Sequence, residues 1–97
     1  MILTNAKDEF LKHTENKAVL CAYIAKDIRL RVGWNEEELA VFLNALDYGY
    51  DSRWGSQQLY GTIWYDDGTW SDRGEYHGIE WWEFHKCPEI PLILINP

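Results

Sequence analysis

The sequence predicts one α+β domain, residues 1–97, in which an antiparallel sheet packs against one or two helices. Four observations lead to this prediction. Residues 17–33 alternate between apolar and polar side chains, and turn signals divide residues 59–86 into three short strands. A capped segment between them has helical spacing, and 97 residues suit a single hydrophobic core. The sheet should therefore comprise an N-terminal strand pair and a C-terminal three-stranded meander.

A short first helix is predicted to begin near Thr4, because Thr4 or Asn5 can cap its first turn. Its apolar face should consist of four residues at helical spacing: Leu3, Ala6, Phe10 and Leu11.

The period-two pattern that follows predicts two strands that meet near Lys26 and Asp27. The inward positions would be Ala18, Leu20, Ala22 and Ile24 in one strand, and Ile28, Leu30 and Val32 in the next. A buried helix across residues 15–25 is the alternative, because the run 18–25 is almost uniformly apolar.

The second helix has the clearest start signal. Asn35 is a good N-cap, Glu38 completes a capping box, and the carboxylates of Glu36, Glu37 and Glu38 suit the positive end of the helix dipole. An i, i+3, i+4, i+7 stripe follows, and Gly49 is the expected stop. The stripe consists of Leu39, Phe42, Leu43 and Leu46.

The meander should run through Leu59–Tyr65, Thr69–Tyr76 and Ile79–Lys86, with turns at 66–68 and 77–78 and Pro88 and Pro91 beyond it. A three-residue first turn and a two-residue second turn fix which residues share a face. One face then carries Tyr60, Thr62, Trp64, Trp70, Asp72, Tyr76, Ile79, Trp81, Glu83 and His85. The other carries Leu59, Ile63, Tyr65, Ser71, Arg73, Trp82 and Phe84. A two-residue first turn would shift the register by one residue and exchange the two faces of one strand.

The aliphatic face of the meander suits packing under the second helix, whereas the other face mixes rings with carboxylates. Trp and Tyr provide large contact areas at low side-chain entropy and dominate binding hot spots. Asp72 opposite Glu83 is a like-charge pair that disfavours the sheet unless a cation or basic partner meets it. In the alternative interpretation, the rings complete a small core or fill space beside Gly61 and Gly74.

The charge distribution bears on the kind of partner. The net charge is −7, and residues 35–97 hold twelve acidic side chains against three basic ones. Such a field repels nucleic acid and attracts basic surfaces, so we expect no direct DNA or RNA binding. With no signal-peptide pattern and no apolar run near the roughly 20 residues of a membrane span, we expect a cytoplasmic protein with no membrane contact. The thiols of Cys21 and Cys87 should be free.

No pattern of residues predicts catalysis or a cofactor. His77, His85, Cys87 and Cys21 do not have the spacing of a zinc site, so we expect no metal. Cys21 lies in an apolar strand, which indicates an inert thiol. Two carboxylate pairs, Asp72 with Glu83 and Glu75 with Glu80, resemble the pairs of glycosidases, but a small sheet without a deep cleft argues against that chemistry. We therefore expect no enzymatic activity.

The C-terminal half carries a specific string: Gly61-Thr62-Ile63-Trp64, Asp67-Gly68-Thr69-Trp70, Arg73-Gly74-Glu75-Tyr76, Glu80-Trp81-Trp82 and Pro88-Glu89-Ile90-Pro91. It resembles small uncharacterised proteins encoded by bacteriophages and prophages. The resemblance implies a phage-like setting in a bacterial host cell but no particular activity. Small acidic phage proteins often inhibit host machinery by occupying nucleic-acid-binding surfaces, and this step is an analogy.

Three functional hypotheses follow. The first is a non-enzymatic acidic accessory protein that inhibits a basic, nucleic-acid-binding host protein such as a nuclease or CRISPR effector. Its partner-binding residues would be Glu36, Glu37, Glu38, Tyr60, Trp64, Trp70, Asp72, Tyr76, Trp81 and Glu83. The second is a carbohydrate or small-ligand module on the same face. The third is a structural homodimer held by residues 92–95, which would otherwise form an edge segment.

Overall fold

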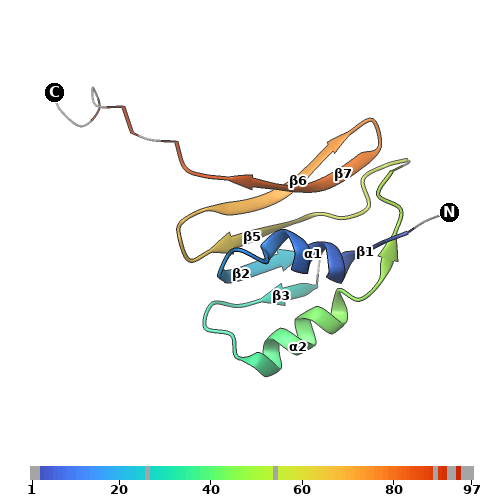
Figure 1. Ribbon diagram of the computed structural model, residues 1–97, viewed down its shortest axis with the longest axis horizontal. Coiled ribbons are helices and arrows are strands. Elements are labelled where there is room, and N and C mark those ends of the chain that lie inside the picture. The colour runs from blue at the N-terminus through green and yellow to red at the C-terminus, as the bar shows by residue number, and fades with distance from the viewer. Residues whose placement is uncertain (1–2, 26, 54, 89, 92–93, 95–97) are drawn as a thin grey trace.

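The computed structural model describes residues 3–25, 27–53, 55–88, 90, 91 and 94. It has the predicted α+β fold, with two helices and two antiparallel sheets of two and five strands (Figure 1). The elements in chain order are β1 (Thr4–Asn5), α1 (Ala6–Thr14), β2 (Val19–Ile24), β3 (Ile28–Leu30), α2 (Glu36–Ala45), β4 (Gly49–Tyr50), β5 (Gly61–Tyr65), β6 (Trp70–Tyr76) and β7 (Ile79–His85).

The predicted strand pair and meander join into one sheet of order β3-β2-β5-β6-β7. The turn geometry explains the meander register, because Gly68 and Gly78 both adopt the positive φ that the turns require. Trp64 pairs with Trp70, and Tyr76 pairs with Ile79, as predicted. The same three-residue turn would place Tyr60 opposite Gly74, but this pair is not formed, since β5 begins at Gly61.

Strand β2 contains a β-bulge that overturns part of its predicted alternation. The register shifts between Val19 and Cys21, so Val19 packs against the core whereas Ala18 and Leu20 are exposed. Ala22 and Ile24, beyond the bulge, are buried as expected.

The two helices begin at the predicted caps. The Asn5 side chain accepts a hydrogen bond from the Asp8 N–H, and the Asn35 side chain accepts one from the Glu38 N–H. The predicted apolar face of α1 is half right, because Ala6 and Phe10 are buried but Leu3 and Leu11 are exposed.

The predicted stop of the second helix is wrong. Helix α2 ends at Ala45, with Leu46 as its C-cap, and Gly49 lies in β4 opposite Asn5. A Cβ at position 49 would come within 3.1 Å of the Leu3 side chain, so this glycine permits close packing of β4 on the N-terminal segment.

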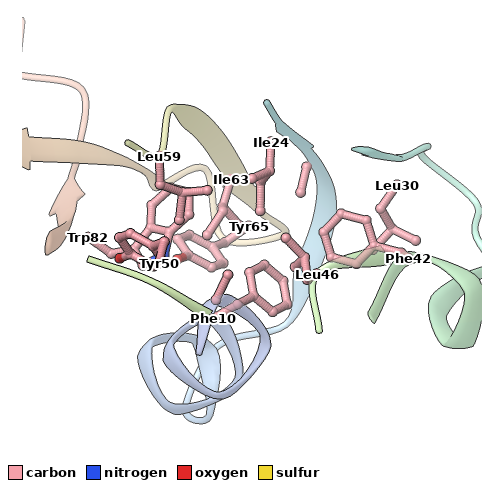
Figure 2. Close-up of a cluster of buried hydrophobic side chains, with 12 residues drawn as sticks. Phe10, Ile24, Leu30, Phe42, Leu46, Tyr50, Leu59, Ile63, Tyr65 and Trp82 are labelled. Carbon is pink, nitrogen blue, oxygen red and sulfur yellow. The ribbon is translucent and has the colours of Figure 1, made fainter. Parts of the chain in front are cut away.

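The core lies between the inner face of the sheet and both helices. Figure 2 shows Trp82, Tyr50 and Leu59 at one end of the cluster and Leu30 and Phe42 at the other. The stripe of α2 packs beside β3 at the end of the sheet, while α1 covers the face of the meander that we expected α2 to cover (Figure 1). The rings of Phe10 and Phe42 pack edge to face, with 5.2 Å between their centroids, and connect the two helices.

Candidate functional site

The outer face of the sheet is the face opposite the helices, and cross-strand pairing arranges its residues in rows. One row runs Cys21, Trp64, Trp70, His85, and the next runs Tyr23, Thr62, Asp72, Glu83. Gly74 with Trp81 and Tyr76 with Ile79 form two further rows on the β6–β7 hairpin. Directly opposed residues share a face, so the register alone brings these side chains together.

Aromatic rings on the outer face are open to solvent. Tyr76 is 67% exposed, Tyr60 59% and Trp64 42%, whereas Trp70 and Trp81 are half-buried. By contrast, Ile63 and Tyr65, which alternate with Trp64 along β5, are fully buried. The indoles of the outer face are therefore not part of the buried core, although Trp81 occupies the space beside Gly74, as the alternative interpretation expected of rings next to strand glycines.

The centre of the outer face is a polar cluster of Asp72, Glu83 and His85. His85 Nε2 lies 2.6 Å from Asp72 Oδ1 and 3.7 Å from Glu83 Oε2. The Trp81 Nε1–H donates to Glu83 Oε1 at 2.9 Å, and the Trp70 ring stacks on the His85 imidazole with 4.4 Å between centroids. The sequence predicts that a cation or basic partner faces the opposed carboxylates of Asp72 and Glu83. In the structure, the His85 imidazole lies against them.

Sequence reasoning considered His85 with His77 and Cys87 and overlooked its contact with Asp72 and Glu83. The signal was present in the predicted register: Asp72 lies opposite Glu83, and His85 follows Glu83 by two residues on the same face. Within the described part of the chain, this is the one place where three His, Cys, Asp or Glu ligand atoms gather within 4.8 Å of one another.

The structure does not bring Glu36, Glu37 and Glu38 to the outer face of the meander. They are exposed at the start of α2, beside β3, which is the opposite edge of the sheet from β7 (Figure 1). Glu37 and Glu38 line a groove with Arg29 and Arg31, so basic side chains accompany the acidic ones there. The predicted partner-binding residues consequently fall into two separate groups.

The inner face holds a buried ion cluster that sequence reasoning missed. Arg73 Nη2 donates to Glu80 Oε1 at 2.8 Å and to the Tyr50 hydroxyl at 2.7 Å, and Arg73 Nη1 lies 3.2 Å from Glu9 Oε2. Burial, and then the hydrogen bond to Glu9, raises the pKa of Tyr50. Glu80 also accepts hydrogen bonds from the backbone N–H groups of Gln58 and Leu59, so both of its carboxylate oxygens have partners.

The two cysteines are free thiols, as predicted. Cys87 is exposed, and Cys21 lies partly buried on the outer face opposite Trp64. Burial raises the pKa of the Cys21 thiol, which lowers its thiolate fraction and agrees with the expectation of an unreactive group.

No family model, curated protein or solved structure matches the chain. The resemblance to phage proteins therefore stays a prediction. Neither of the described helices has the length and apolar composition that a bilayer span requires. The residues 92, 93 and 95, on which the predicted dimer contact depends, lie outside the described residues.

Proposed function

We propose that this chain is a non-enzymatic acidic protein that binds a basic host protein through the outer face of its meander. In the phage-type setting, the partner is a nucleic-acid-binding protein of the bacterial cytoplasm, such as a nuclease or CRISPR effector, and binding inhibits it. The observation that carries the proposal is the exposure of Trp64 and Tyr76 on the same face as the carboxylates of Asp72 and Glu83, a face that both helices leave open.

The rings supply the contact area of the proposed interface. A half-exposed indole or phenol on a rigid strand has little side-chain entropy left to lose, so its burial by a partner is efficient. Trp64 and Trp70 lie opposite each other across β5 and β6, and Trp81 lies on the neighbouring β7. The indoles therefore lie on both sides of the Asp72–Glu83 pair, and rings and carboxylates share one face.

The charges supply the preference for a basic partner. On the inner face, Arg73 neutralises Glu80 within the core, so Arg73 contributes little to the field outside. The outer side of the meander then keeps Asp72 and Glu83, and the first turn adds the exposed carboxylate of Asp66. Such a surface steers a basic protein toward it and repels phosphate groups, which argues against direct nucleic-acid binding.

The test compares two exposed tyrosines. Immobilised protein is incubated with bacterial lysate, and captured proteins are identified and tested for nucleic-acid binding with and without the chain. Tyr76→Ala on the outer face should weaken capture about 30-fold, corresponding to a hot spot of about 2 kcal/mol. Tyr48→Ala is the matched control, because Tyr48 is 37% exposed but follows α2, away from the outer face.

Three results would contradict the proposal. Equal loss in both tyrosine variants would show that capture does not use the outer face. Quenching of tryptophan fluorescence by sugars, with no protein captured, would favour the carbohydrate-binding alternative. A dimer in light scattering that dissociates when residues 92–97 are deleted, again with no captured protein, would favour the homodimer.

A further inference from the structure

We propose that Asp72, Glu83 and His85 form a binding site for a divalent transition metal ion of the zinc class at the centre of the outer face. The inference does not depend on the proposed partner, because it concerns the purified chain alone. It rests on the donor types, their separations and the neighbouring groups that hold them in place.

The donor set suits a borderline metal ion. Two carboxylate oxygens and one imidazole nitrogen are ligands that Zn²⁺ accepts, whereas Mg²⁺ and Ca²⁺ prefer oxygen alone. Two ionised carboxylates opposite each other also repel, and a divalent cation would neutralise Asp72 and Glu83 together. The cluster therefore has the donor chemistry of a cation site and two adjacent carboxylates whose mutual repulsion a cation would relieve.

Two of the three separations require only a small adjustment, and all three ligand atoms lie within 4.8 Å of one another. Bond lengths of about 2.1 Å in tetrahedral geometry place adjacent ligand atoms about 3.4 Å apart. His85 Nε2 is 3.7 Å from Glu83 Oε2 and 2.6 Å from Asp72 Oδ1, and these distances bracket that value. Metal binding would replace the hydrogen bond between His85 and Asp72 and move their donor atoms apart by less than about 1 Å.

Groups outside the cluster orient the ligands. The Trp81 Nε1–H holds Glu83 Oε1, which leaves Oε2 as the oxygen on the His85 side, and the Trp70 ring fixes the plane of the imidazole. Gly74 provides the space for this arrangement, since a Cβ there would lie 2.7 Å from both Glu83 Oε1 and Trp81 Nε1. The absence of a side chain at Gly74 is thus what allows the indole to reach the carboxylate.

The site is open on one side. The side chains of Asp72, Glu83 and His85 are 40%, 42% and 33% exposed, so three protein ligands leave coordination positions directed toward solvent. Zinc sites with three protein ligands and an open position bind water or a ligand from outside. An ion held here would offer that position to a molecule docked on the outer face.

The test is calorimetric titration of the full chain with ZnCl₂ in a buffer without chelators. We expect one equivalent to bind, and Asp72→Asn, Glu83→Gln and His85→Gln each to weaken affinity at least tenfold. Trp81→Phe keeps all three ligands but removes the indole donor, and it should weaken binding about tenfold. His77→Gln and Cys87→Ser are matched controls that should bind like the natural sequence.

Nitrogen NMR of the natural sequence provides a second measurement that needs no variant to fold. Zn²⁺ should shift Nε2 of His85 and leave the ring nitrogens of His13 and His77 unchanged. No saturable binding, binding that survives both His85→Gln and Asp72→Asn, or binding lost in Cys87→Ser would overturn the proposal. Equal binding of Mg²⁺ would also overturn it, because the imidazole would then have no role. If the site exists and no protein is captured from lysate, only the proposed function fails.

Discussion

The buried ion pair of Glu80 and Arg73 predicts that removing the Glu80 charge strongly destabilises the sheet. Their side chains are 1% and 2% exposed. The Glu80 carboxylate accepts hydrogen bonds from the backbone N–H groups of Gln58 and Leu59, at 2.7 and 2.9 Å, and from Arg73 at 2.8 Å. Breaking such a pair by changing one partner leaves a buried charge uncompensated, which costs about 3–5 kcal/mol.

Glu80→Gln tests this charge without creating a cavity, because glutamine has nearly the same shape. Glu9 lies 3.2 Å from Arg73 Nη1 and keeps part of the compensation, so we expect a loss at the lower end, about 3 kcal/mol. For a domain of this length, about 1 kcal/mol corresponds to 4–8 °C in Tm, so the Tm should fall by about 12–24 °C.

Urea denaturation at pH 7, followed by tryptophan fluorescence and far-ultraviolet circular dichroism, measures the change in the free energy of unfolding. Glu75→Gln is the matched control, because Glu75 lies opposite Glu80 in the β6–β7 pair but is exposed. Its effect should stay within about 0.5 kcal/mol. A loss below about 1 kcal/mol for Glu80→Gln, or equal losses in the two variants, would refute the reasoning.

Two further predictions concern stability. Burial, and then the charge of Arg73, lowers the pKa of His13 in the folded protein. The His13 imidazole therefore binds a proton more tightly in the unfolded chain, and the free energy of unfolding falls as the pH drops below about 6.5. Between pH 7 and 5, His13→Gln should lose less free energy of unfolding than the natural sequence; the same pH dependence in both would contradict this. Gly61→Ala should cost about 1–3 kcal/mol in urea denaturation, because its Cβ would lie 2.7 Å from the Tyr23 carbonyl oxygen. An unchanged urea midpoint would contradict this, because it would show that β2 and β5 can move apart at this position without loss of stability.

The sequence was sufficient for features that depend on local signals. Asn5 and Asn35 were predictable as caps because the bond each makes lies within its own first helical turn. The hairpin register was predictable because Gly68 and Gly78 fix the turn lengths, and strict alternation then assigns every residue to a face. The outer face, including the exposure of Trp64, follows from those turns.

Features that depend on contacts between distant segments were not predictable. The bulge after Val19 has no local marker, since it reflects how β2 fits against β5. Gly49 has the composition of a helix stop, but its role is set by the approach of Leu3, which lies 46 residues earlier. The burial of Arg73 depends on partners in α1, β4 and β7, and the pattern of β6 alone contains no sign of them.

The buried and exposed charges of β6 together explain why this register is specific. Asp72 and Arg73 are neighbours in sequence, so alternation sends one to each face of the sheet. A slip of one residue would bury Asp72 without a partner and expose Arg73, leaving Glu80 uncompensated in the core; both changes carry the cost of a buried unpaired charge. The ion pair inside the protein therefore favours the one register that presents the carboxylates and the indoles outside. It follows that Glu80→Gln should reduce ligand binding at the outer face only in proportion to the folded fraction that is lost. Asp72→Asn, by contrast, should lower the affinity of the folded protein for such a ligand.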